Sequence, residues 1–207
     1  VEHTGYQTVR AVPYDLMVAG KDGKTVNALR LWSAECQEFD MSAFNQGDYV
    51  RALETRAMTE TISKVLYPED NHLEGKSLRL RQQYFLVSAS VQDILKRHLH
   101  NYSTLENLPE KVAIHINDTH PALCVPELMR ILMDIHGLSF DEAWKIVTNC
   151  VCYTNHTVMS EALERWSEEL ISRKLPRIYM ILKQINQRFI DEARCLGVSE
   201  HELQNLL

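Results

Sequence analysis

The sequence predicts an α/β fold in which parallel strands alternate with long helices and an antiparallel ribbon comes first. Three observations support this class. An extended stretch turns back on itself at residues 8–34, two long segments then repeat their apolar residues at helical spacing, and two short apolar runs near 111–116 and 150–154 are separated by helical sequence. Strands separated by helices in this way usually pair in parallel.

The first half of the chain predicts the ribbon and two helices. Asp22-Gly23 lies between the extended segments and fits a hairpin turn, which needs a positive φ angle. Residues 49–66 keep apolar side chains near helical spacing, with no glycine or proline before Pro68, so a helix is expected there. From about 77 to 99, apolar residues recur every three or four positions, which predicts a long helix facing the core.

The second half predicts alternating strands and helices. A buried strand is expected at 111–116, followed by a helix over 122–137 that Gly137 ends. Ser139, with Glu142 three residues later, matches the capping box at the start of a further helix. The last expected elements are listed in chain order: a strand at 150–154 and helical segments at 160–166 and 171–194.

Composition limits the class of protein. The 207 residues favour one globular α/β unit, 1–207, and no stretch approaches the roughly 20 apolar residues of a membrane helix. A net charge of −6 with scattered basic residues argues against nucleic acid as a binding partner.

The five cysteines are odd in number and lack zinc-type spacing, so buried free thiols in the reducing cytoplasm are expected. Because the chain starts at Val1 within a strand-like segment, a piece of a larger protein is also expected.

Two of the predicted strands end in polar residues. The sequence "KVAIHINDTHP" brings Asp118 and His120 to the end of one strand, and "CVCYTNHTV" brings Asn155 and His156 to the end of another. In an open parallel sheet, ligands bind outside the carboxyl ends of the strands, so these side chains should face one crevice. Asp and Asn in such places also form turns and cap helices, and for each residue alone that interpretation is at least as good. The coincidence of two clusters favours a site.

The residue types favour a neutral, polyhydroxylated ligand. His120 and His156 come from separate strands with no metal-binding helix motif, so no metal is expected; a metallohydrolase built on this pair is the weakest alternative. On a helix, His98 and His100 would point to different faces. Cys152 could pair with a histidine as a nucleophile, but an interior strand position should hide its thiol. Amide, imidazole and hydroxyl groups instead suit sugar hydroxyls, which both donate and accept hydrogen bonds.

The segment 67–85 connects two predicted helices through a polar, acidic loop. It contains Glu69, Asp70, Asn71 and Glu74, and an ordinary solvated connection is one interpretation of it. We expect that this loop does not hold a phosphate, because neither a helix N-terminus nor a cation there is expected to offset its negative charge.

Four segments together resemble one known family. "NALRLWSA", "VLYPEDNHLEGKSLRLRQQYF", "VAIHINDTHPAL" with "VPELMRIL", and "YTNHTVMSEALERW" are similar to segments of the α-glucan phosphorylases, the glycogen, starch and maltodextrin phosphorylase family. The resemblance runs in order from Ala11 to about Asp191. It implies a partial Rossmann-like N-terminal lobe of a GT-B type glycosyltransferase. In this family a terminal α-1,4 glucosyl unit passes reversibly to inorganic phosphate, which gives glucose-1-phosphate.

The resemblance also implies roles for individual residues. His156 should contact the 6-hydroxyl of the glucosyl unit, and Asn71 should reach the sugar from a mobile gate loop in which Asp70 is the acidic residue. The other residues that should line the pocket, on the β side of the ring, are Asp118, His120 and Thr157. No catalytic, cofactor-binding or metal-binding residue is expected within the segment.

The family implies further parts outside this sequence. Pyridoxal 5'-phosphate should bind a C-terminal domain absent here, and a glycine-rich phosphate loop should precede Val1. The full-length protein should be a homodimer, whereas the 207-residue segment alone should be inactive and should self-associate through exposed apolar surface. The alternative from another class is a noncatalytic α/β module that binds carbohydrate or a protein through the same crevice.

Overall fold

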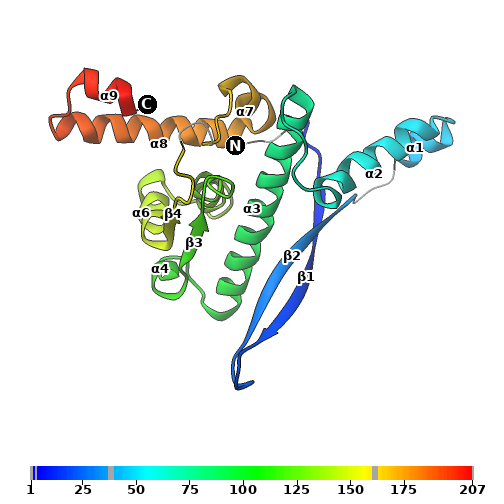
Figure 1. The fold of residues 1–207 in the computed structure, drawn as a ribbon, viewed down its shortest axis with the longest axis horizontal. Coiled ribbons are helices and arrows are strands. Elements are labelled where there is room, and N and C mark those ends of the chain that lie inside the picture. The colour runs from blue at the N-terminus through cyan, green and yellow to red at the C-terminus, as the bar shows by residue number, and fades with distance from the viewer. Residues whose placement is uncertain (1, 3, 37–39, 160–162, 207) are drawn as a thin grey trace. The chain divides into compact units, whose positions relative to one another are not determined.

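The computed structural model describes residue 2 and residues 4–36, 40–159 and 163–206 (Figure 1). The chain forms two compact units, Val1–Leu95 and Lys96–Leu207, and each is described by itself. The expectation of one α/β unit over 1–207 stays a prediction. Among the residues described, no helix is both long and apolar enough to cross a membrane.

The N-terminal unit begins with the expected antiparallel ribbon. Strand β1 (Val9–Ala19) pairs with β2 (Val26–Cys36), in a register that runs from Val9 opposite Cys36 to Ala19 opposite Val26. The turn closes where the Gly20 amide donates to the Thr25 carbonyl at 2.8 Å, and Gly23 has a φ angle of 67°. The prediction of a ribbon with an Asp-Gly turn is therefore confirmed.

One face of the ribbon is fixed to helix α3 (Leu73–Asn101). Arg30 donates to Asp15 on the neighbouring strand at 2.6 and 2.7 Å and to Asp93 on the helix at 2.8 Å. Trp32 Nε1 donates to Ser90 at 3.1 Å. Because side chains alternate along a strand, the neighbours of these residues point to the other face.

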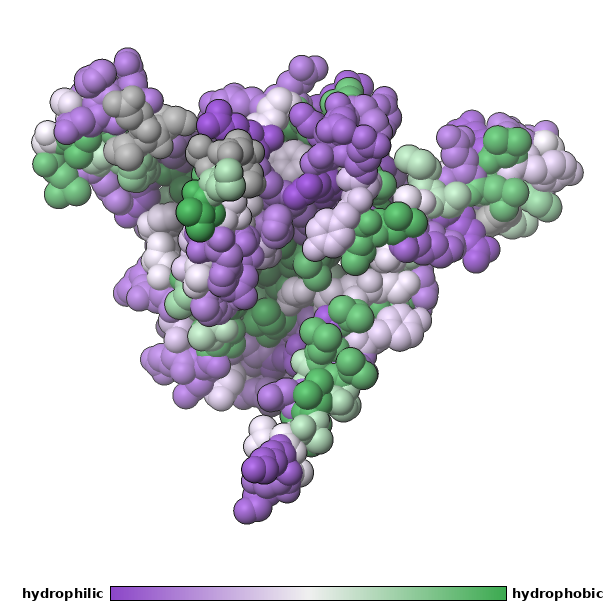
Figure 2. All heavy atoms as spheres, in the orientation of Figure 1, coloured by the Kyte–Doolittle hydropathy of each residue, from purple (hydrophilic) through white to green (hydrophobic). Residues whose placement is uncertain are grey.

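That other face of the ribbon is apolar and exposed. Tyr14 and Leu16 on β1 lie opposite Leu31 and Leu29 on β2, and all four side chains are more than half exposed. In Figure 2, hydrophobic residues follow much of the ribbon.

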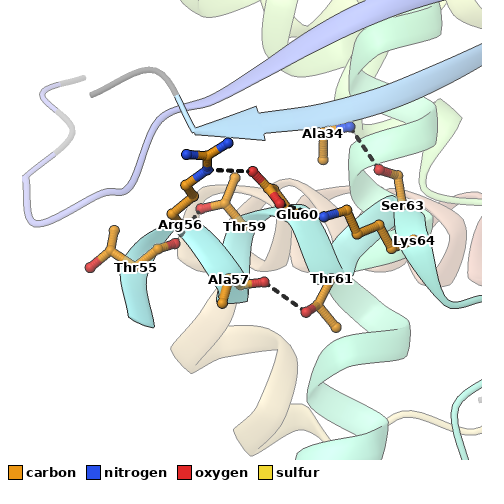
Figure 3. Close-up of polar contacts among 9 residues, drawn as sticks. All are labelled: Ala34, Thr55, Arg56, Ala57, Thr59, Glu60, Thr61, Ser63 and Lys64. Carbon is orange, nitrogen blue, oxygen red and sulfur yellow. Dashed lines mark hydrogen bonds and ion pairs between the residues drawn. The ribbon is translucent and has the colours of Figure 1, made fainter. Parts of the chain in front are cut away.

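Two further helices complete the unit: α1 (Met41–Asn45) and α2 (Tyr49–Lys64). Asp48 caps α2 by accepting the Arg51 amide at 3.0 Å, which confirms the helix expected after this residue. The helix is joined to β2 where Ser63 Oγ accepts the Ala34 amide at 2.8 Å (Figure 3). On the surface of the same helix, Glu60 pairs with both Arg56 and Lys64 (Figure 3).

The C-terminal unit contains a parallel pair of strands among helices. Strand β3 (Ile114–Asn117) pairs with β4 (Val151–Thr154), in a register that runs from Ile114 beside Val151 to Asn117 beside Thr154. The parallel pairing expected from the order of elements is thus confirmed. The helices of this unit are α4 (Leu108–Lys111), α5 (Cys124–Arg130), the π-helical turn η1 (Ile131–Ile135), α6 (Phe140–Cys150), α7 (Glu168–Lys174), α8 (Pro176–Cys195) and α9 (Glu200–Leu206).

The helix signals in this unit are largely confirmed. Glu142 N donates to Ser139 Oγ at 3.3 Å and Glu142 Oε2 accepts the Ser139 amide at 2.8 Å, which completes the capping box of α6. Gly137, at a φ angle of 74°, follows η1, and its amide donates to the Met133 carbonyl. The largest apolar side chains buried in the unit are Leu108, Leu128, Met129, Leu132, Ile178, Ile181 and Leu203.

Several expected boundaries are wrong. The strand expected from residue 111 starts at Ile114, because Lys111 ends the short helix α4. The helix expected at 171–194 is divided into α7 and α8 at Leu175, which has φ −133° and ψ 59°; proline disfavours helical backbone in the residue before it, and Pro176 follows. The helix expected at 77–99 runs over Leu73–Asn101. Of the helix expected at 160–166, residues 160–162 lie outside the described residues and 163–166 are not helical.

A shielded ion pair joins η1 to α8. Arg177 donates to both carboxylate oxygens of Asp134 at 2.6 and 2.8 Å, and the two side chains are only 14% and 9% exposed. The hydrogen bonds from Arg177 lower the pKa of Asp134. Arg177 therefore stabilises the ionised form of Asp134.

We predict that Arg177→Met destabilises the 207-residue chain by about 3 kcal/mol, because it leaves the Asp134 carboxylate shielded without its cation. Arg173→Met, at an exposed position on the neighbouring helix α7, is the control and should change stability by less than about 0.5 kcal/mol. Urea unfolding of both variants measures the difference. Equal midpoints for the two variants would contradict the role given to the ion pair.

Candidate functional site

The polar residues expected at the two strand ends do come together. Asn117 is the last residue of β3 and lies beside Thr154, the last residue of β4, so the chain leaves both strands at the same edge. The Asp118 amide donates to the Thr154 carbonyl at 2.8 Å, which extends the pairing by one residue. We call Asn117, Asp118, Asn155, His156 and Thr157 the strand-end cluster.

Asp118 holds the cluster together through one oxygen. Its Oδ1 accepts hydrogen bonds from the His156 amide at 3.1 Å, the Thr157 amide at 3.2 Å and the Thr157 hydroxyl at 2.9 Å. The φ angle of Asp118 is 60°, a left-handed conformation that Asp and Asn tolerate better than most residues. The carboxylate therefore fixes the backbone that follows β4.

The hydrogen bonds to Asp118 also keep it ionised. Partial desolvation of its carboxylate acts to raise the pKa, but the hydrogen bonds from the Thr157 hydroxyl and from the His156 and Thr157 amides outweigh it. The pKa of Asp118 is lowered as a result. Its negative charge is thus present at neutral pH and belongs to the framework of the cluster.

The His156 ring is exposed and has one nitrogen engaged. Nε2 lies 3.2 Å from Asn117 Oδ1. Because a carbonyl oxygen can only accept, the hydrogen of the neutral ring belongs on Nε2, and Nδ1 is left as an acceptor. Asn155 forms a turn with Thr157, since its Oδ1 accepts the Thr157 amide at 3.0 Å and its Nδ2 donates to the Thr157 carbonyl at 3.1 Å. The backbone on both sides of His156 is therefore held.

His120 lies in the loop after β3 and contacts a residue that the sequence did not indicate. His120 Nδ1 is 3.3 Å from Glu164 Oε1, and Thr119 Oγ1 donates to Glu164 Oε2 at 2.8 Å. Glu164 was expected in a helix, where its contact with a loop about 45 residues away could not be foreseen. Its backbone is not helical in the structure.

The chemistry of the cluster is that of hydrogen bonding to neutral groups. It presents imidazole, amide and hydroxyl groups around one ionised carboxylate, and it includes no Lys or Arg. Among the residues described, no group of three His, Cys, Asp or Glu side chains could hold a metal ion; the expectation of a metal-free site stays a prediction.

The prediction that the cysteines are buried is partly wrong. Cys124 and Cys150 are buried, and burial raises the pKa of each thiol to about 11. Cys152 is exposed, because it lies on the uncovered face of β4, so the argument that its thiol is hidden does not hold. Cys195 is exposed as well, and none of the five cysteines forms a disulfide.

The loop before α3 belongs to the N-terminal unit and contains two of the predicted site residues. Arg79 donates to Asp70 at 3.0 Å, and Asn71 Nδ2 donates to Glu69 at 2.7 Å. The expectation that no cation or helix N-terminus offsets the acidic charge is wrong, because Arg79 pairs with Asp70 and α3 begins at Leu73. The structure thus brings Asp118, His156 and Thr157 together in one unit, while Asp70 and Asn71 lie in the other.

Gly75 fixes the shape of this loop. A Cβ atom at this position would lie 1.8 Å from the Glu69 carbonyl oxygen, which is a backbone atom that cannot rotate away. The Gly75 amide also donates to His72 Nδ1 at 2.9 Å, which caps the start of α3. The loop can approach the helix this closely only because position 75 has no side chain.

The carboxyl edge of parallel strands, where this polar cluster of neutral hydrogen-bonding groups lies, is where α/β proteins commonly bind small ligands. The family model described as carbohydrate phosphorylase matches residues 1–206. The chain belongs to the carbohydrate phosphorylase family, which confirms the resemblance seen in the sequence.

Curated relatives agree with the family. The chain is 47% identical over 197 residues to glycogen phosphorylase of Haemophilus influenzae, 47% over 212 residues to the brain form of Rattus norvegicus, and 45% over 209 residues to the muscle form of Oryctolagus cuniculus. These alignments cover 95%, 95% and 93% of the chain. The chain spans about a quarter of the length of these relatives, with 24–25% of each covered.

The lowered pKa of Asp118 gives a prediction with a definite sign. A carboxylate whose pKa is lower in the folded than in the unfolded state stabilises its cluster above the ordinary Asp pKa of about 3.9, and this contribution is lost as the pH falls through the folded value. We expect the His156 and Thr157 amides to be protected from hydrogen exchange at neutral pH and to lose protection, after correction for intrinsic rates, in acid.

Asp118→Asn is the matched control, because it retains an acceptor oxygen and tolerates the left-handed backbone but does not titrate. In this variant the protection should no longer change between pH 6 and the acid range. Protection that falls equally in both proteins would show that another group opens the cluster.

We predict that Gly75→Ala destabilises the chain by about 1–3 kcal/mol, because the loop must move away from the new methyl group. Elsewhere in a helix the same substitution is stabilising by about 0.5–1 kcal/mol, so the sign alone is diagnostic. Lys76→Ala, at the adjacent exposed position, is the control and should be nearly neutral. A stabilised Gly75→Ala protein in urea unfolding would mean that the loop does not lie where the structure has it.

Proposed function

We propose that this chain is a segment of an α-1,4-glucan phosphorylase, which transfers terminal glucosyl units reversibly to inorganic phosphate and forms glucose-1-phosphate. Besides family membership, the observation that supports this proposal most is His156, whose ring is held through Asn117 and whose Nδ1 remains an acceptor. A sugar hydroxyl is a suitable donor for such an atom. The names of the relatives make glycogen the first substrate to test.

In this proposal the strand-end cluster positions the glucosyl unit. His156 accepts a hydrogen bond from the 6-hydroxyl through Nδ1. Asp118 accepts the His156 amide and the Thr157 hydroxyl. Asp118 and Thr157 line the pocket on the β side of the ring, together with His120. As the family resemblance implies, Asn71 would reach the sugar from a gate loop in which Asp70 is the acidic residue.

The proposed chemistry depends on parts that this chain does not supply. Pyridoxal 5'-phosphate, which the family uses, would assist proton transfer through its phosphate. The strand-end cluster does not fit that group, because it contains an ionised carboxylate and no Lys or Arg to meet a phosphate. We therefore assign binding and orientation to this chain, and we expect the 207 residues alone to form no glucose-1-phosphate.

We further propose that the chain is part of a Rossmann-like lobe of the GT-B type, and that the complete protein is a cytoplasmic homodimer. The parallel pair β3–β4 supports the first point, and five cysteines that form no disulfide suit a reducing compartment. The exposed apolar face of the ribbon supports self-association of the isolated segment.

A noncatalytic module that binds carbohydrate or a protein through the same cluster is the alternative. The natural reading frame separates the two proposals: a phosphorylase requires a cofactor lysine and a glycine-rich phosphate loop in the rest of the protein. Their absence would leave only the binding module.

The role of His156 predicts a specific kinetic pattern. In the full-length enzyme, His156→Ala should lower kcat/KM for glucose-1-phosphate roughly ten- to a hundredfold, the effect of one well-placed hydrogen bond. Removal of the 6-hydroxyl from the substrate should lower kcat/KM of the wild type by a similar factor. It should change kcat/KM of the His156→Ala variant little. If the 6-deoxy substrate costs both enzymes the same factor, His156 does not contact this hydroxyl.

A further inference from the structure

We propose that Glu164 is a positioning residue that fixes the orientation and tautomer of His120, so that His120 Nε2 faces the sugar as an acceptor. This inference rests on the proposed function, in which His120 lines the glucosyl pocket. It adds a residue that neither the sequence motifs nor the family resemblance singled out.

The contacts of Glu164 suit this role. Its two carboxylate oxygens face two consecutive residues of the loop after β3: Oε2 accepts the Thr119 hydroxyl at 2.8 Å, and Oε1 lies 3.3 Å from His120 Nδ1. Because each oxygen faces a different group, rotation of the carboxylate would break one contact or the other. The Thr119 hydroxyl thus holds the carboxylate in place beside the imidazole.

The two side chains differ in exposure, and this difference indicates which of them can contact a ligand. The Glu164 side chain is 10% exposed, whereas that of His120 is 52% exposed. A sugar at the strand ends could thus reach the exposed imidazole while the largely buried carboxylate does not contact it. We therefore assign contact with the ligand to His120 and support to Glu164.

The chemistry of the pair sets which nitrogen meets the ligand. A carboxylate only accepts hydrogen bonds, so it favours the ring tautomer with hydrogen on Nδ1. The other nitrogen, Nε2, then has a free lone pair. A histidine oriented by a carboxylate in this way is a common arrangement when one ring nitrogen must meet a ligand in a fixed state.

A double-mutant cycle in the full-length enzyme tests the proposal. Glu164→Ala should lower kcat/KM for glucose-1-phosphate by about tenfold when His120 is present, and by less than about twofold in a His120→Ala background, because a residue that acts through another loses its effect when that residue is removed. Glu164→Gln, which retains an acceptor oxygen, should recover most of the loss.

Three results are decisive. Equal losses from Glu164→Ala in the two backgrounds would overturn the proposal, since Glu164 would then act independently of His120. A lower unfolding temperature with unchanged kcat/KM would overturn it too, because the role would be structural only. A wild-type enzyme that forms no glucose-1-phosphate would instead refute the proposed function on which the inference rests.

Discussion

The geometry of the candidate site depends on the carboxylate of Asp118. Its Oδ1 is a shared acceptor for two backbone amides and one hydroxyl from the residues that follow β4. Without this oxygen, the amides of His156 and Thr157 would lose their hydrogen bonds to the residue that follows β3. The parallel register makes the contact possible, because Asn117 lies beside Thr154 and the next residue on each strand leaves the sheet at the same edge. The left-handed backbone of Asp118 then turns its carboxylate toward the other strand.

This constraint connects the fold to the proposed activity. A ligand hydroxyl is positioned well only if its partner is already held before binding, because ordering a side chain during binding costs free energy. His156 meets this requirement in two ways: its backbone is bound to Asp118, and its ring is bound to Asn117. The charge of the cluster lies on the Asp118 carboxylate, which binds the following backbone, while the exposed groups available to a ligand include no Lys or Arg. Such a division suits a sugar better than a phosphate.

The sequence predicted the elements whose signals are local. The Asp-Gly turn, the capping box of Ser139 and Glu142, and Gly137 as a helix stop each depend on a few neighbouring residues, and all are present. The strand-end cluster was also predicted, because parallel strands bring their carboxyl ends together.

What could not be predicted depends on distant contacts. Arg79 pairs with Asp70 across nine positions, and Glu164 reaches Thr119 across 45. Cys152 was judged from its strand alone, although its exposure depends on what covers that face of the sheet.

The most direct measurement of the central claim is a crystal structure of the full-length protein with α-D-glucose bound. The account predicts that the 6-hydroxyl lies within about 3.2 Å of His156 Nδ1, a normal hydrogen-bond distance, while Nε2 stays on Asn117 and Asp118 keeps its contacts with the following strand end. A glucose bound at the strand-end cluster without contact to His156, or bound away from this cluster, would contradict the account.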